Sequence, residues 1–296
     1  MNTFKRSWLL FRSSLQVMNQ NRKLLLFPLI TTIASIIIVL FFLAPAVWHS
    51  AVGGRELVYF DNTPQHQWHL TPVGYVCAAV LYMIAMFVAT FCNVAFYSQI
   101  MSALSGEAAS VGAGFAFAKT RIRSIIIWSL FAGAIGILIS TLERRFGWVG
   151  RIVLRIIGMV WSVASSFAIP VIISEEDSNP IHILKNSADT IKKTWGELLV
   201  GYVGIRLGGL VILVLMVPLI VVFTFFTTFI HSTVSPLILI SGITLWMLVI
   251  FSVSYLTSIA NDIFRCALYL YASKGIVTPA YSAEVMNSAW KTKKKK

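Results

Sequence analysis

Six long apolar stretches constrain the fold more than any other feature of the sequence. They cover roughly residues 24–49, 72–104, 124–142, 152–173, 198–230 and 237–272. Each reaches or exceeds the about 20 residues that an α-helix needs to cross the hydrocarbon core of a bilayer. Lipid offers the backbone no hydrogen-bond partners, so such stretches must be helical. The pattern predicts an all-α membrane protein, a bundle of about six transmembrane helices with cytosolic interfacial amphipathic helices.

The composition excludes an ordinary soluble domain. Charged residues make up 12% of the chain, whereas a soluble domain carries about 25%. The first apolar stretch is longer than the about 7–15 residues of a signal-peptide core, so we expect an uncleaved anchor. Cys77, Cys92 and Cys266 lie far apart in apolar sequence, where free cysteine behaves as a small hydrophobe. We expect no disulfide, no metal site and no cofactor.

The net charge of +13 is explained by membrane topology and not by nucleic-acid binding. With a cytosolic N-terminus and six helices, every lysine falls on the cytosolic side. This bias is the one that the positive-inside rule describes. Both termini are therefore predicted to be cytoplasmic, with the basic C-terminal KTKKKK close to anionic lipid headgroups.

The same frame divides the chain into three parts. Residues 1–23 form a cytosolic interfacial amphipathic segment, because apolar residues recur there at helical spacing: Phe4, Trp8, Phe11, Leu15 and Met18. Residues 24–273 form the six-helix transmembrane domain, and residues 274–296 a basic cytosolic tail. Within the domain, we expect a small exposed loop over 48–71 and an irregular glycine-containing connector over 105–123.

A cytosolic amphipathic helix is predicted over residues 179–196. Asn179 is a suitable N-cap, and Pro180 at the first helical position needs no amide donor. The apolar residues of this helix repeat every three or four positions: Ile181, Leu184, Ala188, Ile191 and Trp195. We expect the helix to lie along the cytosolic surface.

Small residues at four-residue spacing predict close contacts between helices. They form three groups: Ala132 with Gly136, Gly158 with Ser162 and Ser166, and Gly204 with Gly208. Small side chains let backbones approach where lipid provides no hydrophobic drive for association. Packing inside the bundle is favoured, and a homo-oligomer is the alternative.

Charged residues within the apolar stretches are the best remaining functional clues, since they are expensive in lipid. Arg206 lies in the fifth stretch, and Asp262 and Arg265 lie near the cytosolic end of the sixth. Arg206 and Asp262 are predicted to be at similar heights and to pair. A structural ion pair is favoured over a polar path that couples transport.

A second cluster of charge lies in the outer hairpin around residues 143–155. Four arginines accompany the lone acid Glu143: Arg144, Arg145, Arg151 and Arg155. They are candidates for an outer vestibule that attracts anions. Binding of lipid phosphates, or pairing with Glu56 and Asp61 of the external loop, is favoured over that function.

Catalytic motifs are missing from the sequence. We find no GxSxG, HExxH, Walker or dinucleotide-binding signature. The predicted external histidines His49, His66, His69 and His231 give no sign of converging on a metal. The protein is therefore not expected to be an enzyme.

Three segments carry a resemblance to a known family. They are FKRSWLLFRSSLQVMNQNRKLLLFPL, the region LERRFGWVGRIVLRIIGMVWSVASSFAIPVIISEEDSNPIHILKNSADTIKKTWGELLVGYVG, and IFRCALYLYASKGIVTP. Together they resemble a bacterial family of uncharacterised six-helix integral membrane proteins. More loosely, the cytosolic pattern of acids, proline, amphipathic helix and tryptophan is similar to membrane domains associated with glycerophosphodiester phosphodiesterases. The resemblance implies a multi-pass protein of the bacterial inner membrane, and it implies no reaction.

Two function classes remain open. The first, slightly favoured by the buried arginine, is a channel-like or permease-like protein for small polar or anionic solutes. The second is a membrane-organising or accessory protein that binds lipids or partner proteins, and the lack of a dense polar stripe within the apolar stretches favours it. The bilayer with its anionic headgroups is the expected partner in both cases.

Overall fold

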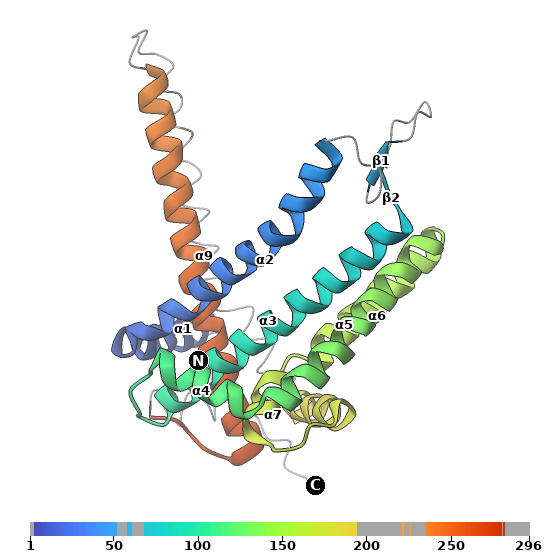
Figure 1. Cartoon of the computed structure of the whole chain (residues 1–296). Coiled ribbons are helices and arrows are strands. Elements are labelled where there is room, and N and C mark those ends of the chain that lie inside the picture. The colour runs from blue at the N-terminus through green and yellow to red at the C-terminus, as the bar shows by residue number, and fades with distance from the viewer. Residues whose placement is uncertain are drawn as a thin grey trace. The chain divides into compact units, whose positions relative to one another are not determined.

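The computed structural model describes residues 3–51, 58–60, 68–193, 221, 225, 235–279 and 281. Figure 1 shows the elements in chain order. They are α1 (Thr3–Gln20), the 3-10 helix η1 (Arg22–Leu25), α2 (Leu26–Ala51), β1 (Val58–Phe60), β2 (Trp68–Leu70), α3 (Pro72–Leu104), α4 (Val111–Thr120), α5 (Ile122–Arg145), α6 (Trp148–Ala164), α7 (Ala168–Ser174) and α9 (Ser235–Lys274). Residues 180–193 are also helical.

Five of the predicted apolar stretches form helices that are long and apolar enough to cross a membrane. They span Arg22–Phe42, Pro72–Leu104, Ile122–Glu143, Gly150–Ser174 and Ile240–Lys274. The stretch 198–230 lies outside the described residues apart from positions 221 and 225. The helical membrane fold is therefore confirmed, and the sixth helix stays a prediction.

The connector over 105–123 was predicted to be irregular, and this is wrong for most of its length. Residues 111–120 form α4. Glycine is needed here for close packing and not for flexibility: a Cβ atom on Gly114 would lie 2.8 Å from the carbonyl oxygen of Ala95 on α3. Within this connector, Gly106 has a φ of 92°, a positive value that favours glycine.

The segment 48–71, predicted as a small exposed loop, contains regular secondary structure in its described residues. Helix α2 continues to Ala51, and β1 pairs antiparallel with β2. The pairs are Val58 with Leu70, Tyr59 with His69, and Phe60 with Trp68. Backbone pairing of these two short, aromatic-rich strands accounts for the difference.

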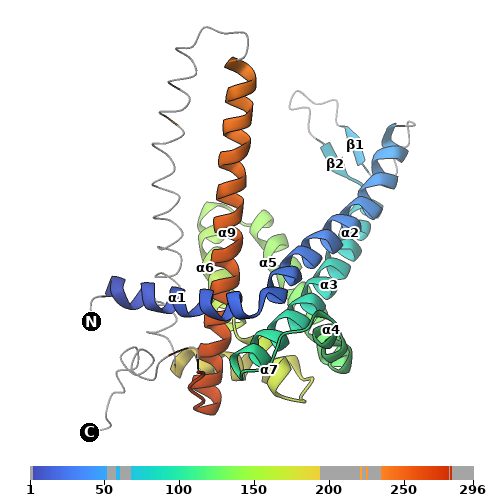
Figure 2. The same ribbon diagram turned by 90° about the vertical axis from the view of Figure 1, so that its left-hand side faces the viewer.

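The chain forms two compact units. One contains Met1–Arg22, Ile100–Ala108 and Lys192–Lys296, and in it α1 packs across α9 (Figure 2). Leu10, Ser14 and Val17 are buried at helical spacing on α1, while Arg12 is exposed. The hydroxyl groups of Ser14 and the buried Tyr281 share a hydrogen bond of 2.6 Å. Helix α1 is thus amphipathic, and its buried face meets protein.

The other unit contains Lys23–Gln99 and Ala109–Ile191. Phe27 joins α2 to its neighbours through ring contacts with Phe96 at 5.5 Å and Phe115 at 5.9 Å. Helices α5 and α6 run side by side (Figure 1), with the rings of Trp128 and Trp161 stacked at 6.2 Å.

Small residues allow the close contacts of this second unit. On α5, Gly136 lies directly under the Tyr82 hydroxyl of α3, as the predicted packing face requires. On α6, a Cβ atom at Gly158 would meet Ile139 of α5 at 3.9 Å, an ordinary contact distance, so glycine is not required at this position. Gly204 and Gly208 lie outside the described residues.

Candidate functional site

The described span Gly150–Ser174 is interrupted between two helices. The side chain of Ser187, from a later helix, forms hydrogen bonds with the backbone on both sides of the interruption. Helix α6 ends at Ala164 and α7 begins at Ala168. The Ser187 hydroxyl donates to the Ala164 carbonyl at 2.6 Å and accepts from the Phe167 N–H at 3.0 Å. Ser187 is completely buried. Irregular backbone in a membrane protein needs such partners inside the protein.

The hydrogen bonds of Ser187 determine which face of the helical segment 180–193 packs against protein. The buried residues are spaced four, three and one apart: Ile183, Ser187, Thr190 and Ile191. Of the residues of the predicted apolar face, Ile191 is buried, Leu184 is half-buried and Ile181 is 64% exposed. Trp195 lies outside the described residues. The protein-facing side is thus offset from the predicted apolar face, whose interfacial role stays a prediction.

The acidic loop before this helix is held by local contacts. The predicted cap is confirmed, since the Asn179 side-chain oxygen accepts from the Ile181 N–H at 3.0 Å. Asp177 accepts from the Asn179 N–H at 2.9 Å and pairs with His182 at 2.7 Å. Donation by Asn179, followed by the contact with His182, lowers the pKa of Asp177. Glu175 accepts from the Asn186 amide at 2.6 Å. These side chains hold the loop and the start of the helix through hydrogen bonds, so they are weak candidates for catalytic or binding residues.

The outer arginines are only partly brought together. Arg155 of α6 donates from Nε to Glu143 of α5 at 3.1 Å. Arg145 and Arg151 are both exposed. Arg144 lies in α5, and its side chain is outside the described part of the structure. The single acid of the hairpin therefore engages one of the arginines.

The predicted intramembrane pair lies partly outside the described residues. Arg206 belongs to the stretch that the structure does not describe. On α9, Asp262 and Arg265 approach to 4.0 Å at i,i+3 spacing. Both of these side chains are partly exposed. Within the described ranges, no group of His, Cys, Asp and Glu side chains is arranged to hold a metal ion.

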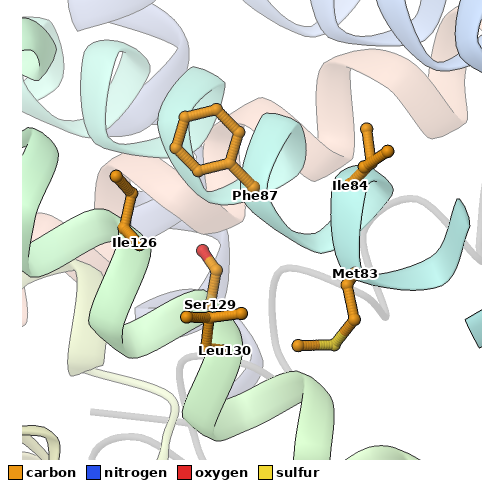
Figure 3. A pocket seen from close by; sticks show the side chains of 6 residues that line it. All are labelled: Met83, Ile84, Phe87, Ile126, Ser129 and Leu130. Carbon is orange, nitrogen blue, oxygen red and sulfur yellow. The ribbon is translucent and has the colours of Figure 1, made fainter. Parts of the chain in front are cut away.

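Among the described residues, an apolar groove lies between α3 and α5. Its volume is about 330 Å³, and Figure 3 shows the side chains that line it: Met83, Ile84, Phe87, Ile126, Ser129 and Leu130. Ser129 contributes the one hydroxyl, which donates to the Ile125 carbonyl at 2.7 Å. The groove thus offers hydrocarbon walls and little hydrogen bonding.

Basic residues lie where α4 meets α5. Arg121 sits over the Phe117 ring at 5.8 Å and pairs with Glu176 at 3.7 Å. Lys119 and Arg123 are exposed. From the sequence, these cations were interpreted only as determinants of topology. The groove was not predicted, because i,i+4 apolar pairs such as Met83 with Phe87 occur in any apolar helix.

Comparison with known families places the chain in one family. A family model described as a family of unknown function, DUF6159, matches residues 72–278. The chain belongs to this family. No curated protein and no solved structure matches it. The match confirms the predicted resemblance to an uncharacterised family. It assigns no biochemical activity to the chain.

Proposed function

We propose that this DUF6159 protein is a non-enzymatic, multi-pass membrane protein that binds lipids or partner proteins along its spans and so organises the surrounding membrane. The open apolar groove between α3 and α5 carries this proposal. A groove with hydrocarbon walls on the side of a membrane helix pair suits an acyl chain or an apolar helix better than a polar solute.

The polar side chains of the same helices favour binding over transport. Channels need polar groups that face a water-filled path. Here the hydroxyl groups of Thr90, Ser98 and Ser129 donate to carbonyls of their own helices at 2.7, 2.8 and 2.7 Å. Gln99 accepts from the Ser110 N–H at 2.8 Å. The donor or acceptor used in each of these bonds is thus engaged within the protein, which supports binding over transport.

The outer hairpin supports a second candidate, a channel-like or permease-like protein for small polar or anionic solutes. Glu143 pairs with Arg155, while Arg145 and Arg151 add positive charge at the same hairpin. A cluster of one sign of charge concentrates counter-ions and speeds their arrival. The cluster would then form the outer mouth of a path.

Reconstitution in liposomes separates the two candidates. The binding function predicts no flux of anions, cations or small polar solutes above protein-free liposomes, together with phospholipid that remains bound through purification in mild detergent. The transport function predicts anion flux that falls when Arg145, Arg151 and Arg155 are changed to glutamine. Flux with that dependence overturns the first candidate, and absence of flux removes the second.

The orientation belongs to the same proposal: a bacterial inner membrane with both termini in the cytoplasm. The asymmetric distribution of lysine supports it. A variant without native cysteines, carrying one new cysteine at Gln65 or Lys192, checks it in intact cells. An impermeant thiol reagent should label position 65 and not position 192, and the opposite labelling contradicts the orientation.

A further inference from the structure

We propose that the groove between α3 and α5 binds one anionic phospholipid, with an acyl chain along the groove and the phosphate on the guanidinium of Arg123. This site rests on the proposed lipid-binding function and names the class of lipid. The groove, the exposed cation and their common position on α5 carry the inference.

The hydrocarbon part of the site is defined by the groove walls. Met83, Ile84 and Phe87 come from α3, and Ile126 and Leu130 come from α5 (Figure 3). The Ser129 hydroxyl is satisfied within α5, so water in the groove would have few partners. An acyl chain exchanges its van der Waals contacts with bulk lipid for contacts with these walls, at no hydrophobic cost.

The charged part of the site is Arg123. It is exposed, and among the described residues it makes no ion pair. Arg121, two positions earlier, is 18% exposed and paired with Glu176. A guanidinium presents a planar set of donors that fits a phosphate at two points. Of these two arginines, Arg123 is therefore the one available to a headgroup.

The two parts lie on one stripe of α5. Arg123, Ile126 and Leu130 follow the i, i+3, i+7 spacing of a single helix face, and all three are exposed. At 1.5 Å per residue, the Cα atom of Arg123 is about 4.5 Å along the axis from that of Ile126 and about 10 Å from that of Leu130. Arg123 is the second residue of the span Ile122–Glu143. A phosphate there lies at the boundary of the apolar span, with its acyl chain directed along the groove.

The test uses the full chain in mild detergent and measures lipid binding by native mass spectrometry. Phosphatidylglycerol is the anionic probe and phosphatidylcholine the zwitterionic one. We expect the parent protein to prefer phosphatidylglycerol, and Arg123→Gln to bind it about tenfold more weakly, since a hydrogen-bonded charge contact contributes about 1.5–3 kcal/mol. Arg123→Lys should retain part of the affinity.

Lys119→Gln is the matched control for charge, because Lys119 is an exposed cation that lies in α4, outside the α5 stripe. It should bind phosphatidylglycerol within twofold of the parent. Equal loss in Lys119→Gln and Arg123→Gln would reduce the effect to nonspecific electrostatics and overturn the site.

The acyl part has its own pair of variants. Leu130→Trp fills the groove and should weaken phosphatidylglycerol binding, whereas Leu138→Trp, at an exposed α5 position that does not line the groove, should not. Glycerol phosphate, which lacks acyl chains, should fail to compete. Competition by glycerol phosphate, or equal binding by both tryptophan variants, contradicts the role of the groove.

These outcomes separate the site from the proposed function. If the parent, Arg123→Gln and Leu130→Trp proteins all retain the same amount of phospholipid, the lipid binds elsewhere. In that case only the proposed site is wrong. A parent protein that retains no phospholipid contradicts both. Thermal unfolding of each variant in detergent confirms that changes in binding do not come from misfolding.

Discussion

The two halves of α3 have similar side chains and opposite surroundings. In the first half, apolar residues project outward, with Val76 63% and Val73 57% exposed. In the second half, Val94 and Ala95 are completely buried, and Phe96 contacts Phe27 of α2 at 5.5 Å. The exposed side of the first half is available to lipid, while Val94 and Ala95 of the second half are enclosed by protein.

The difference shows that apolar character alone does not identify the core of a membrane protein. In lipid, an exposed valine costs nothing, so hydrophobic residues suit both surroundings. The packed half is marked by residues that lipid would not favour, such as the buried Ser98 and Gln99. It also faces Gly114, whose missing side chain lets α4 approach Ala95.

The most severe test of this comparison is to add a side chain at Gly114. Gly114→Leu should lower the free energy of unfolding by about 3 kcal/mol, because the backbone oxygen at 2.8 Å cannot move aside as a flexible side chain can. Gly112→Leu is the control, since no atom lies within 4 Å of its added Cβ. Thermal or denaturant unfolding in detergent measures both. Equal stability of the two variants would mean that α4 does not pack on α3 as described.

Removing the Ser187 hydroxyl tests whether a polar contact holds the broken span. Ser187→Ala leaves the Ala164 carbonyl and the Phe167 N–H without this buried partner, at an expected cost of about 2 kcal/mol. Ser140→Ala removes an exposed hydroxyl that bonds only within α5, and its stability should stay close to that of the parent. A fully stable Ser187→Ala protein would show that the break is supported by other groups.

Identical substitutions in the two halves of α3 sharpen the comparison directly. Val94→Ala should destabilise the protein by about 1.5 kcal/mol, because it removes buried methyl groups and leaves a cavity. Val76→Ala should change stability by less than about 0.5 kcal/mol, as exposed substitutions usually do. Similar losses at both positions would contradict the assignment of the first half to lipid.

The smallest expected effect concerns Tyr281 in the other unit. Tyr281→Phe removes the hydrogen bond with Ser14 and should cost about 1 kcal/mol. Burial raises the pKa of Tyr281 above its usual value, so the folded state favours the neutral phenol. The parent should therefore lose stability as pH rises above about 10, the pKa of unfolded tyrosine. Unfolding curves between pH 8 and 11 should show this loss in the parent and less of it in Tyr281→Phe.

The sequence by itself determined the features that depend on the bilayer or on neighbouring residues. Five spans could be predicted because each contains at least the about 20 apolar residues that a helix needs to cross the hydrocarbon core. The cap at Asn179 is equally local, because its side chain reaches an N–H only two residues away.

Only the tertiary structure decided which of several similar residues is used, and for what. Ser187 meets backbone 20 and 23 residues away, and Gly114 meets Ala95 across a turn between helices. Arg121 and Arg123 have the same chemistry in the sequence, yet one is paired with Glu176 and the other is exposed. Such contacts depend on how helices approach one another. In a soluble protein the pattern of apolar residues predicts this approach, but in a membrane both lipid-facing and protein-facing residues are apolar, so the pattern carries little information.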